Sequence, residues 1–93
     1  MMEYIKENEI SDATAFRAMG HPTRCWIVKE LSKEEHCVGE FVKTVGVEFA
    51  TMSRHLAKLR KSGILTYRKK GREIYYQLNR PRLNKLFEQF KAP

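Results

Sequence analysis

The sequence predicts a mainly α-helical fold that carries one β-hairpin. Apolar residues recur at helical spacing through most of the chain. Gly46 separates two short stretches of this kind, which is typical of a helix-turn-helix. Two β-branched and aromatic runs then flank a charged turn at Lys69-Lys70-Gly71. Because a hairpin that follows a helix-turn-helix is its wing, the predicted fold class is a winged helix-turn-helix.

The length and charge of the chain narrow the expectation further. The 93 residues are predicted to form a single domain, residues 1–93, with a modest core. A homodimer would add burial that one subunit lacks. Residues 1–48 contain 6 basic and 9 acidic side chains, whereas residues 49–93 contain 12 basic and 2 acidic. A second half this basic favours a polyanionic partner.

The first half of the chain predicts two helices. The first follows Ser11-Asp12 and ends at Gly20, and residues 1–10 either extend it or form a flexible arm. A second helix begins at Pro22, since proline suits the first helical position. Residues 32–36 are predicted to be a polar connection.

The second half predicts the helix-turn-helix, the hairpin and a last helix. A short amphipathic helix covers residues 38–45, and a longer one covers residues 49–62. The strands of the hairpin are expected at residues 64–67 and 74–78. The last helix, residues 81–91, carries an apolar stripe and is assigned to a dimer interface. The stripe consists of Leu83, Leu86, Phe87 and Phe90.

The helix at residues 49–62, here called the reading helix, has two distinct faces. At about 100° per residue, Met52, Leu56 and Leu59 cluster on one side and must face the core. The opposite face consists of Thr51, Arg54, His55, Lys58 and Lys61. Such side chains can contact base edges and phosphates in a major groove. Ser53, at the flank, could bond a phosphate or its own backbone. An ordinary solvated surface is the alternative interpretation.

The hairpin adds a second cationic element beside the reading helix. Its basic residues are Arg68, Lys69, Lys70 and Arg72. Such a tip would lie along the DNA backbone or enter the minor groove. It would also protect an edge strand from aggregation, and both roles can hold at once. Between Phe49 and Arg72 the chain has eight Lys or Arg residues and no acid, which favours the DNA role.

Composition and motifs argue against several other classes of protein. Charged residues throughout positions 1–15 argue against a signal peptide, and no apolar run approaches the roughly 20 residues of a membrane span. Two cysteines without a secretory signal favour a reducing cytoplasm. An enzyme is not expected, because the chain lacks a Cys-x-x-Cys motif, a Gly-rich phosphate loop and a plausible Ser/His/Asp arrangement.

Four stretches of the chain carry more specific motifs. They are His21-Pro22-Thr23-Arg24, residues 35–41 (E-H-C-V-G-E-F), residues 51–60 (T-M-S-R-H-L-A-K-L-R) and residues 67–78 (Y-R-K-K-G-R-E-I-Y-Y-Q-L). Together they resemble the ArsR/SmtB family of bacterial metal- and stress-responsive repressors over about residues 13–90. The run V-S-R-H-L-x-x-L-R-x-x-G, followed by a basic G-R-x-x-Y-Y-x-L wing, is specific to this family, and here Met52 replaces the valine.

The resemblance implies a winged-helix homodimer that represses its double-stranded operator until a metal, metalloid or thiol-reactive inducer releases it. Two reading helices in one dimer would require an inverted-repeat operator. The chain departs from the family pattern at Glu48-Phe49, where many members have Ser-Gln, so a contact from that glutamine is not expected. A constitutive DNA-binding regulator without small-molecule sensing is the alternative function. The residues implied to face operator DNA are Thr51, Ser53, Arg54 and His55.

Residues 35–41 also resemble the inducer-binding segment of the family, which often reads E-L-C-V-C-D-L or E-L-C-V-G-D-L. Cys37 matches the first cysteine and Glu40 the acid, whereas Gly39 stands where the second cysteine would be. A metalloid requires three thiolates and the chain has two cysteines, so a mixed-ligand metal ion such as zinc is the better fit. Thiol oxidation, a disulfide between the cysteines, or no cysteine sensing are the alternatives. The predicted metal ligands are Cys37, Cys25 and Glu40, with His36 and His21 as further candidates.

Overall fold

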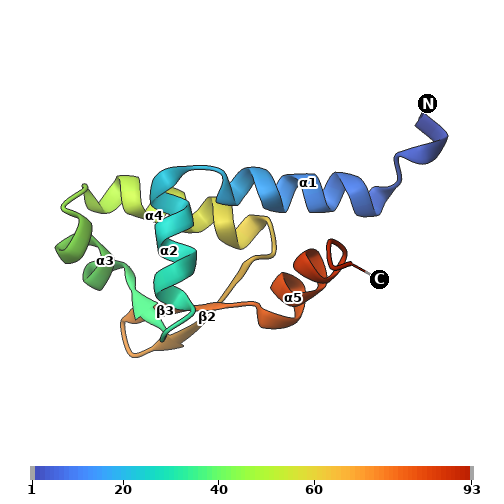
Figure 1. Cartoon of the computed structure of the whole chain (residues 1–93). Coiled ribbons are helices and arrows are strands. Elements are labelled where there is room, and N and C mark those ends of the chain that lie inside the picture. Colours follow the sequence, from blue (N-terminus) through green and yellow to red (C-terminus); the bar gives the residue numbers. More distant parts are fainter. Residues whose placement is uncertain (1, 93) are drawn as a thin grey trace.

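The computed structural model describes residues 2–92, so Met1 and Pro93 of the predicted domain lie outside the described residues. The elements are η1 (Met2–Tyr4), α1 (Glu7–Met19), α2 (Pro22–Leu31), β1 (His36–Cys37), α3 (Val38–Val45), α4 (Phe49–Lys61), β2 (Leu65–Lys70), β3 (Glu73–Leu78) and α5 (Arg80–Glu88). In Figure 1, α2 crosses from the end of α1 to the hairpin, and α5 lies below α1. No helix within the described range is long and apolar enough to span a membrane.

The predicted helix-turn-helix is formed by α3 and α4. Gly46 ends α3 with a φ of +79°, and its N–H donates to the carbonyl of Val42. Glycine adopts this left-handed backbone without a steric penalty. The chain therefore reverses within three residues, and α4 begins at Phe49 as the reading helix.

The core fixes the rotation of α4. Met52, Leu56 and Leu59 are all fully buried, which confirms the core face predicted from helical spacing. The other fully buried large side chains are Phe41, Ile27, Ile64 and Leu86. Because one face of α4 is held by these contacts, its opposite face is turned outward.

The sheet contains a strand that the sequence did not indicate. The strand order is β1-β3-β2, all antiparallel, and β1 pairs His36 with Tyr76 and Cys37 with Tyr75. The prediction of a polar connection over residues 32–36 is therefore wrong at its end. A two-residue strand has no periodicity of its own and exists only because β3 lies beside it.

The hairpin is longer and its turn tighter than predicted. The strands extend through Lys70 and resume at Glu73, which pair with each other across a two-residue turn. Gly71 takes a φ of +64° in this turn. The strand β2 therefore includes Arg68, Lys69 and Lys70, which were predicted in the turn. Basic side chains can occupy this strand because its residues after Leu65 are exposed to water.

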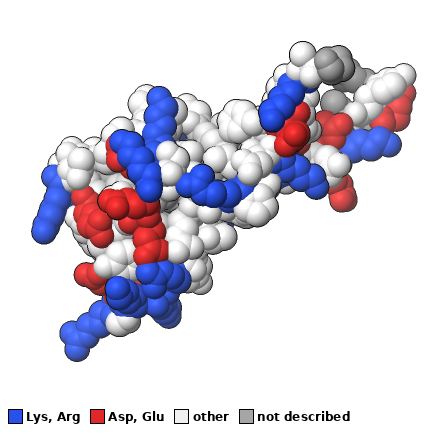
Figure 2. All heavy atoms as spheres, turned by 60° about the horizontal axis from the view of Figure 1, so that its bottom comes forward, with Lys and Arg blue, Asp and Glu red and all other residues white. Residues whose placement is uncertain are grey.

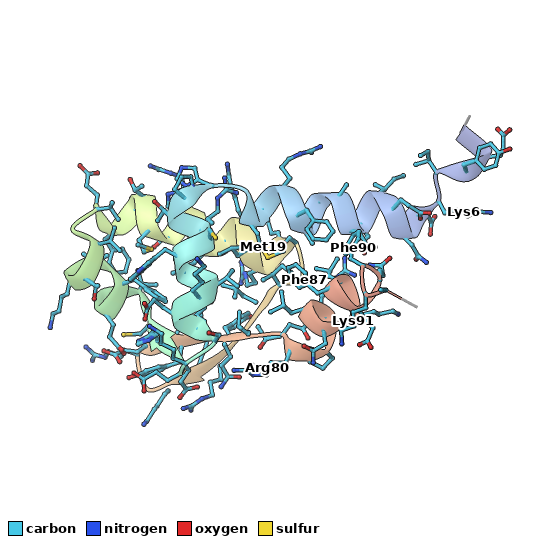
Figure 3. All side chains as sticks on the ribbon, in the orientation of Figure 1. Lys6, Met19, Arg80, Phe87, Phe90 and Lys91 are labelled. Atoms are coloured by element: carbon cyan, nitrogen blue, oxygen red, sulfur yellow. The ribbon has the colours of Figure 1, made fainter. Side chains whose placement is uncertain are left out.

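The last helix, α5, contacts the first helix, α1. The first helix begins at Glu7, so part of the predicted arm extends it. The apolar stripe of the last helix is divided, because Leu86 is fully buried in the subunit's own core while Phe87 and Phe90 remain 52% and 70% exposed. Figure 3 shows these two rings pointing from α5 toward α1. Phe16 of α1 meets them edge-on, with ring centroids 6.0 and 5.7 Å away.

Candidate nucleic-acid interface

The outward face of α4 presents cations without acidic partners. Arg54 is exposed, and its Nη2 donates only to Thr51 Oγ1, 3.3 Å away. Lys58, one turn further on, is also exposed and makes no ion pair within residues 2–92. Ser53 is half-buried at the flank. The fold therefore turns the predicted polar face of α4 to solvent.

His55 differs from its neighbours on this face, because its ring packs against His21 at the start of α2. The two ring centroids are 4.7 Å apart. His21 Nδ1 accepts a hydrogen bond from the N–H of Thr23 at 3.1 Å, which makes it the cap of α2. Burial, followed by the charges of His21, Arg24, Lys58 and Arg54, lowers the pKa of His55. His55 is thus a half-buried link between α2 and α4.

The hairpin presents a second set of exposed cations. Lys69, Lys70 and Arg72 are exposed and carry no ion pair in the described part of the chain. The charge of Lys70 lies 5.9 Å from the ring centroid of Tyr75. Figure 2 shows Lys and Arg gathered at this end of the molecule, with acidic residues beside them.

Arg68 is the exception among the hairpin cations. Its Nε donates to Glu35 at 2.9 Å, and its Nη2 makes a second, shorter bond to the same carboxylate. Gln77 Nε2 also donates to Glu35, at 2.6 Å. These hydrogen bonds, from Arg68 first and Gln77 second, lower the pKa of Glu35 to about 2. The positive charge of Arg68 is therefore compensated within the subunit, and the carboxylate ties the hairpin to the connection between α2 and β1.

This tie should make stability depend on pH in a defined window. The pKa of Glu35 is lower in the folded chain than its ordinary 4.5, so its contribution is complete above pH 4.5 and is lost as pH falls toward 2. We expect Glu35→Gln to have a melting temperature that changes less than that of the wild type between these pH values. Glu34→Gln, at the exposed neighbouring carboxylate, is the matched control. If the melting temperatures of Glu35→Gln and wild type changed equally with pH, Glu35 would not be the source of this pH dependence.

Cys37 lies at the corner where β1, α3 and α4 meet. Its thiol is buried at the N-cap of α3, and its Sγ donates to Glu40 Oε1 at 3.3 Å. His36 Nδ1 lies 2.7 Å from the other oxygen of Glu40, and this hydrogen bond lowers the pKa of Glu40. Burial raises the pKa of the Cys37 thiol. Burial thus disfavours the thiolate form of Cys37.

A cavity of about 340 Å³ opens beside this thiol. We call it the Cys37 cavity. Its lining joins the start of α3, the first turns of α4 and the end of the hairpin. The lining residues are Cys37, Val38, Gly39, Phe49, Ser53, Arg72, Glu73, Ile74 and Tyr76. A group attached to Cys37 would therefore touch both elements that carry the candidate DNA contacts.

The predicted metal ligands are only partly brought together. Cys37 and Glu40 are in contact, but Cys25 is an exposed free thiol on α2. Among residues 2–92, no group of three His, Cys, Asp or Glu side chains is arranged to hold a metal ion. Sequence spacing could not reveal that Cys25 is separated from Cys37, because the burial of Ile27 and Leu31 sets the rotation of α2.

These features define a class of protein. An exposed cationic helix face in a helix-turn-helix, flanked by an exposed cationic hairpin, is the arrangement of a winged helix-turn-helix protein that binds duplex DNA. Residues 21–67 match the family described as bacterial regulatory protein, arsR family. The chain belongs to this family. It is accordingly a DNA-binding transcriptional repressor and not an enzyme.

Curated relatives extend the similarity beyond these residues. A CadC homolog from Staphylococcus aureus, named a cadmium resistance transcriptional regulatory protein, is 36% identical over 85 residues, which are 90% of this chain and 70% of the relative. The SmtB repressor of Mycobacterium tuberculosis is 38% identical over 72 residues, 75% of this chain and 53% of the repressor. The chain therefore spans only about half the length of SmtB.

Solved structures share the fold. An ArsR-like transcriptional regulator from Rhodococcus sp. RHA1 has a TM-score of 0.82 at 26% identity, covering 90% of this chain and 79% of the regulator. The transcriptional repressor BigR from Xylella fastidiosa has a TM-score of 0.70 at 29% identity, covering 100% and 99%. These similarities confirm the predicted winged helix-turn-helix.

Proposed function

We propose that the protein binds an inverted-repeat operator as a homodimer and releases it when an inducer reacts at Cys37. The observation that best supports operator binding is the outward face of α4, where Arg54 is exposed and has no acidic partner among the described residues. Thr51, Ser53, Arg54 and His55 would approach the bases. Lys58, Lys69, Lys70 and Arg72 would hold phosphates, with Arg68 contributing less because Glu35 compensates its charge. Such a repressor acts in the cytoplasm, where its DNA lies.

The direct test is a binding titration on duplex DNA from the region upstream of the protein's own gene. It is repeated with a panel of divalent metals, arsenite, antimonite, peroxide and polysulfide. The proposal expects tight, salt-dependent binding that at least one inducer weakens. Binding that no member of the panel weakens would favour the alternative, a constitutive regulator.

The proposed dimer rests on the exposed aromatic rings of α1 and α5. Phe87 and Phe90 remain largely outside the subunit core, and Phe16 completes the same cluster. A monomer would leave this apolar surface in water, whereas a second copy would cover it. In Figure 1, α1 extends away from the helix-turn-helix and α5 lies below it. The two α4 helices would then lie about one DNA turn, roughly 34–36 Å, apart.

We expect Phe87→Glu to shift the protein from dimer to monomer, because the interface would have to bury a carboxylate. Sedimentation velocity at micromolar concentration measures the change. Phe49→Glu is the matched control, since Phe49 is exposed at the other end of the molecule and should not affect the dimer. A wild-type protein that sediments as a monomer under these conditions would refute the proposed assembly.

The inducer site is the second part of the proposal. Cys37 caps α3 and lines the cavity that also contacts Phe49 and Ser53 at the start of α4. A metal ion or oxidised sulfur at Cys37 would break its bond to Glu40 and enlarge the group in the cavity. That change would push on α4 and the hairpin together. The name of the cadmium-resistance relative supports a soft metal ion as one inducer class.

A further inference from the structure

A second cavity, of about 330 Å³, lies where α1, α2 and α4 meet. Four basic side chains from these three helices line it, and we call it the basic cavity. They are Arg17, Arg24, Lys58 and Lys61. The remaining lining is uncharged and consists of Thr14, Ala18 and Ser62. The fold therefore gathers four positive charges around one hollow, although Arg17 and Lys61 are 44 positions apart in the chain.

None of the four cations has an acidic partner within residues 2–92. Two other arginines do have acidic partners, because Arg68 pairs with Glu35 and Arg82 pairs with Asp12. The Nε of Arg24 is buried and donates no hydrogen bond to any residue that the structure describes. A guanidinium donor removed from water without an acceptor destabilises the fold, and four like charges around one hollow repel each other. An anion in the basic cavity would relieve both effects.

The basic cavity is continuous with the outward face of α4. Lys58 belongs to both, because it lies one turn beyond Arg54 on the same helix face and also lines the cavity. His55 connects the two regions, since the charges of Arg24, Lys58 and Arg54 all act on its ring and contribute to lowering its pKa. A DNA duplex lying against Arg54 would therefore pass beside this cavity.

We propose that the basic cavity holds one phosphate of the operator backbone, next to the base pairs that α4 reads. The inference rests on the DNA-binding function of the protein and adds Arg17 and Arg24, from α1 and α2, to its contacts. A guanidinium group can bind a phosphate through two parallel hydrogen bonds, and Lys58 and Lys61 supply further charge. A phosphate contact carries no sequence information, so its role is to fix the position of α4 in the groove.

The test compares Arg24→Gln and Arg17→Gln with Lys29→Gln in the full chain. Lys29 is exposed on α2 and does not line the cavity, so its substitution removes the same charge elsewhere. Affinity is measured for the upstream duplex and for a scrambled duplex across a range of salt concentrations. Each arginine variant should weaken both duplexes by the same factor, about tenfold. It should also flatten the plot of log affinity against log salt by about 0.9. Arginine variants that bind like Lys29→Gln would overturn the proposal.

Thermal melting separates binding from folding. Because the Nε of Arg24 has no partner, Arg24→Gln should keep or raise the melting temperature. If Arg24→Gln instead fails to fold, the binding data for Arg17→Gln test the proposal. The side chain of Arg17 is exposed, so its replacement should not disturb the core. A wild type that binds no duplex would contradict the DNA-binding function itself, which is a different outcome from equal binding by wild type and variants.

A free anion offers the same chemistry as a backbone phosphate, so a second measurement distinguishes them. Inorganic phosphate and pyrophosphate are titrated into the wild type and Arg24→Gln by calorimetry. Weak binding that competes with DNA agrees with a site built for the backbone. Tight binding that requires Arg24, together with DNA affinity that does not, would identify a small-anion site and overturn the assignment to DNA.

Discussion

Replacing Arg54 with alanine is expected to weaken operator binding by about 1–3 kcal/mol and to relax base preference at one position of each half-site. The guanidinium is exposed on α4, and within residues 2–92 its one hydrogen bond is to Thr51 Oγ1. An arginine in this state can bond the major-groove edge of a guanine through two hydrogen bonds. Affinities for the operator and for a scrambled duplex, measured side by side, check the effect, because only the operator affinity should fall steeply.

Two sets of controls accompany this result. Arg60→Ala removes the same charge from α4, but Arg60 lies over the ring of Tyr67, 5.2 Å from its centroid, and should barely affect base preference. Lys69→Ala and Lys70→Ala should weaken all DNA about equally and flatten the salt dependence by about one unit each. An Arg54→Ala protein that loses operator and scrambled affinity together would show Arg54 to be a phosphate contact.

Replacing Cys37 with serine is expected to abolish the response to inducer while leaving DNA binding intact. Serine is a favourable N-cap, so α3 should keep its start. The thiol is the only group of Cys37 that can bind a soft metal ion or be oxidised, and it lines the cavity shared with α4 and the hairpin. Coupling of this kind is typically worth about 1–3 kcal/mol, so inducer should weaken wild-type DNA binding about 5- to 150-fold. The same titration on Cys37→Ser should show no such change.

The pH dependence of induction provides a second measurement. Burial raises the pKa of the Cys37 thiol, so a metal ion that binds the thiolate must displace a proton. Inducer affinity should therefore fall as pH is lowered. Cys25→Ser, at the exposed cysteine of α2, is the matched control and should respond like the wild type. A normal response by Cys37→Ser would move the sensing site elsewhere in the protein.

The elements that the sequence predicted well are those whose causes are local. Pro22 starts α2 and Gly46 ends α3, each through its own backbone geometry. The buried face of α4 follows from residues three and four positions apart, which always share one side of a helix. The wing was visible for a similar reason, since its two strands are neighbours in the chain and their turn needs a glycine.

The elements that the sequence missed depend on segments far apart in the chain. The strand at His36–Cys37 exists because β3 provides its hydrogen-bond partners. The burial of Leu86 depends on α5 folding back onto the core, so the apolar stripe of that helix could not be divided in advance into core and exposed parts. Cys25 was a candidate partner of Cys37 because the chain has two cysteines. The rotation of α2 instead leaves Cys25 exposed.

The sequence by itself determined that this is a winged helix-turn-helix protein, which helix carries the cationic polar face, and that Arg54 is on that face. Only the tertiary structure decided which cations lack an acidic partner among residues 2–92. Arg68 is compensated by Glu35, 33 positions away, whereas Arg17 and Arg24 join Lys58 and Lys61 around one cavity. The physical reason is that residues close in the sequence set helical periodicity. The interaction energy of two charges instead falls with their distance in space, which depends on the segments that the core brings together.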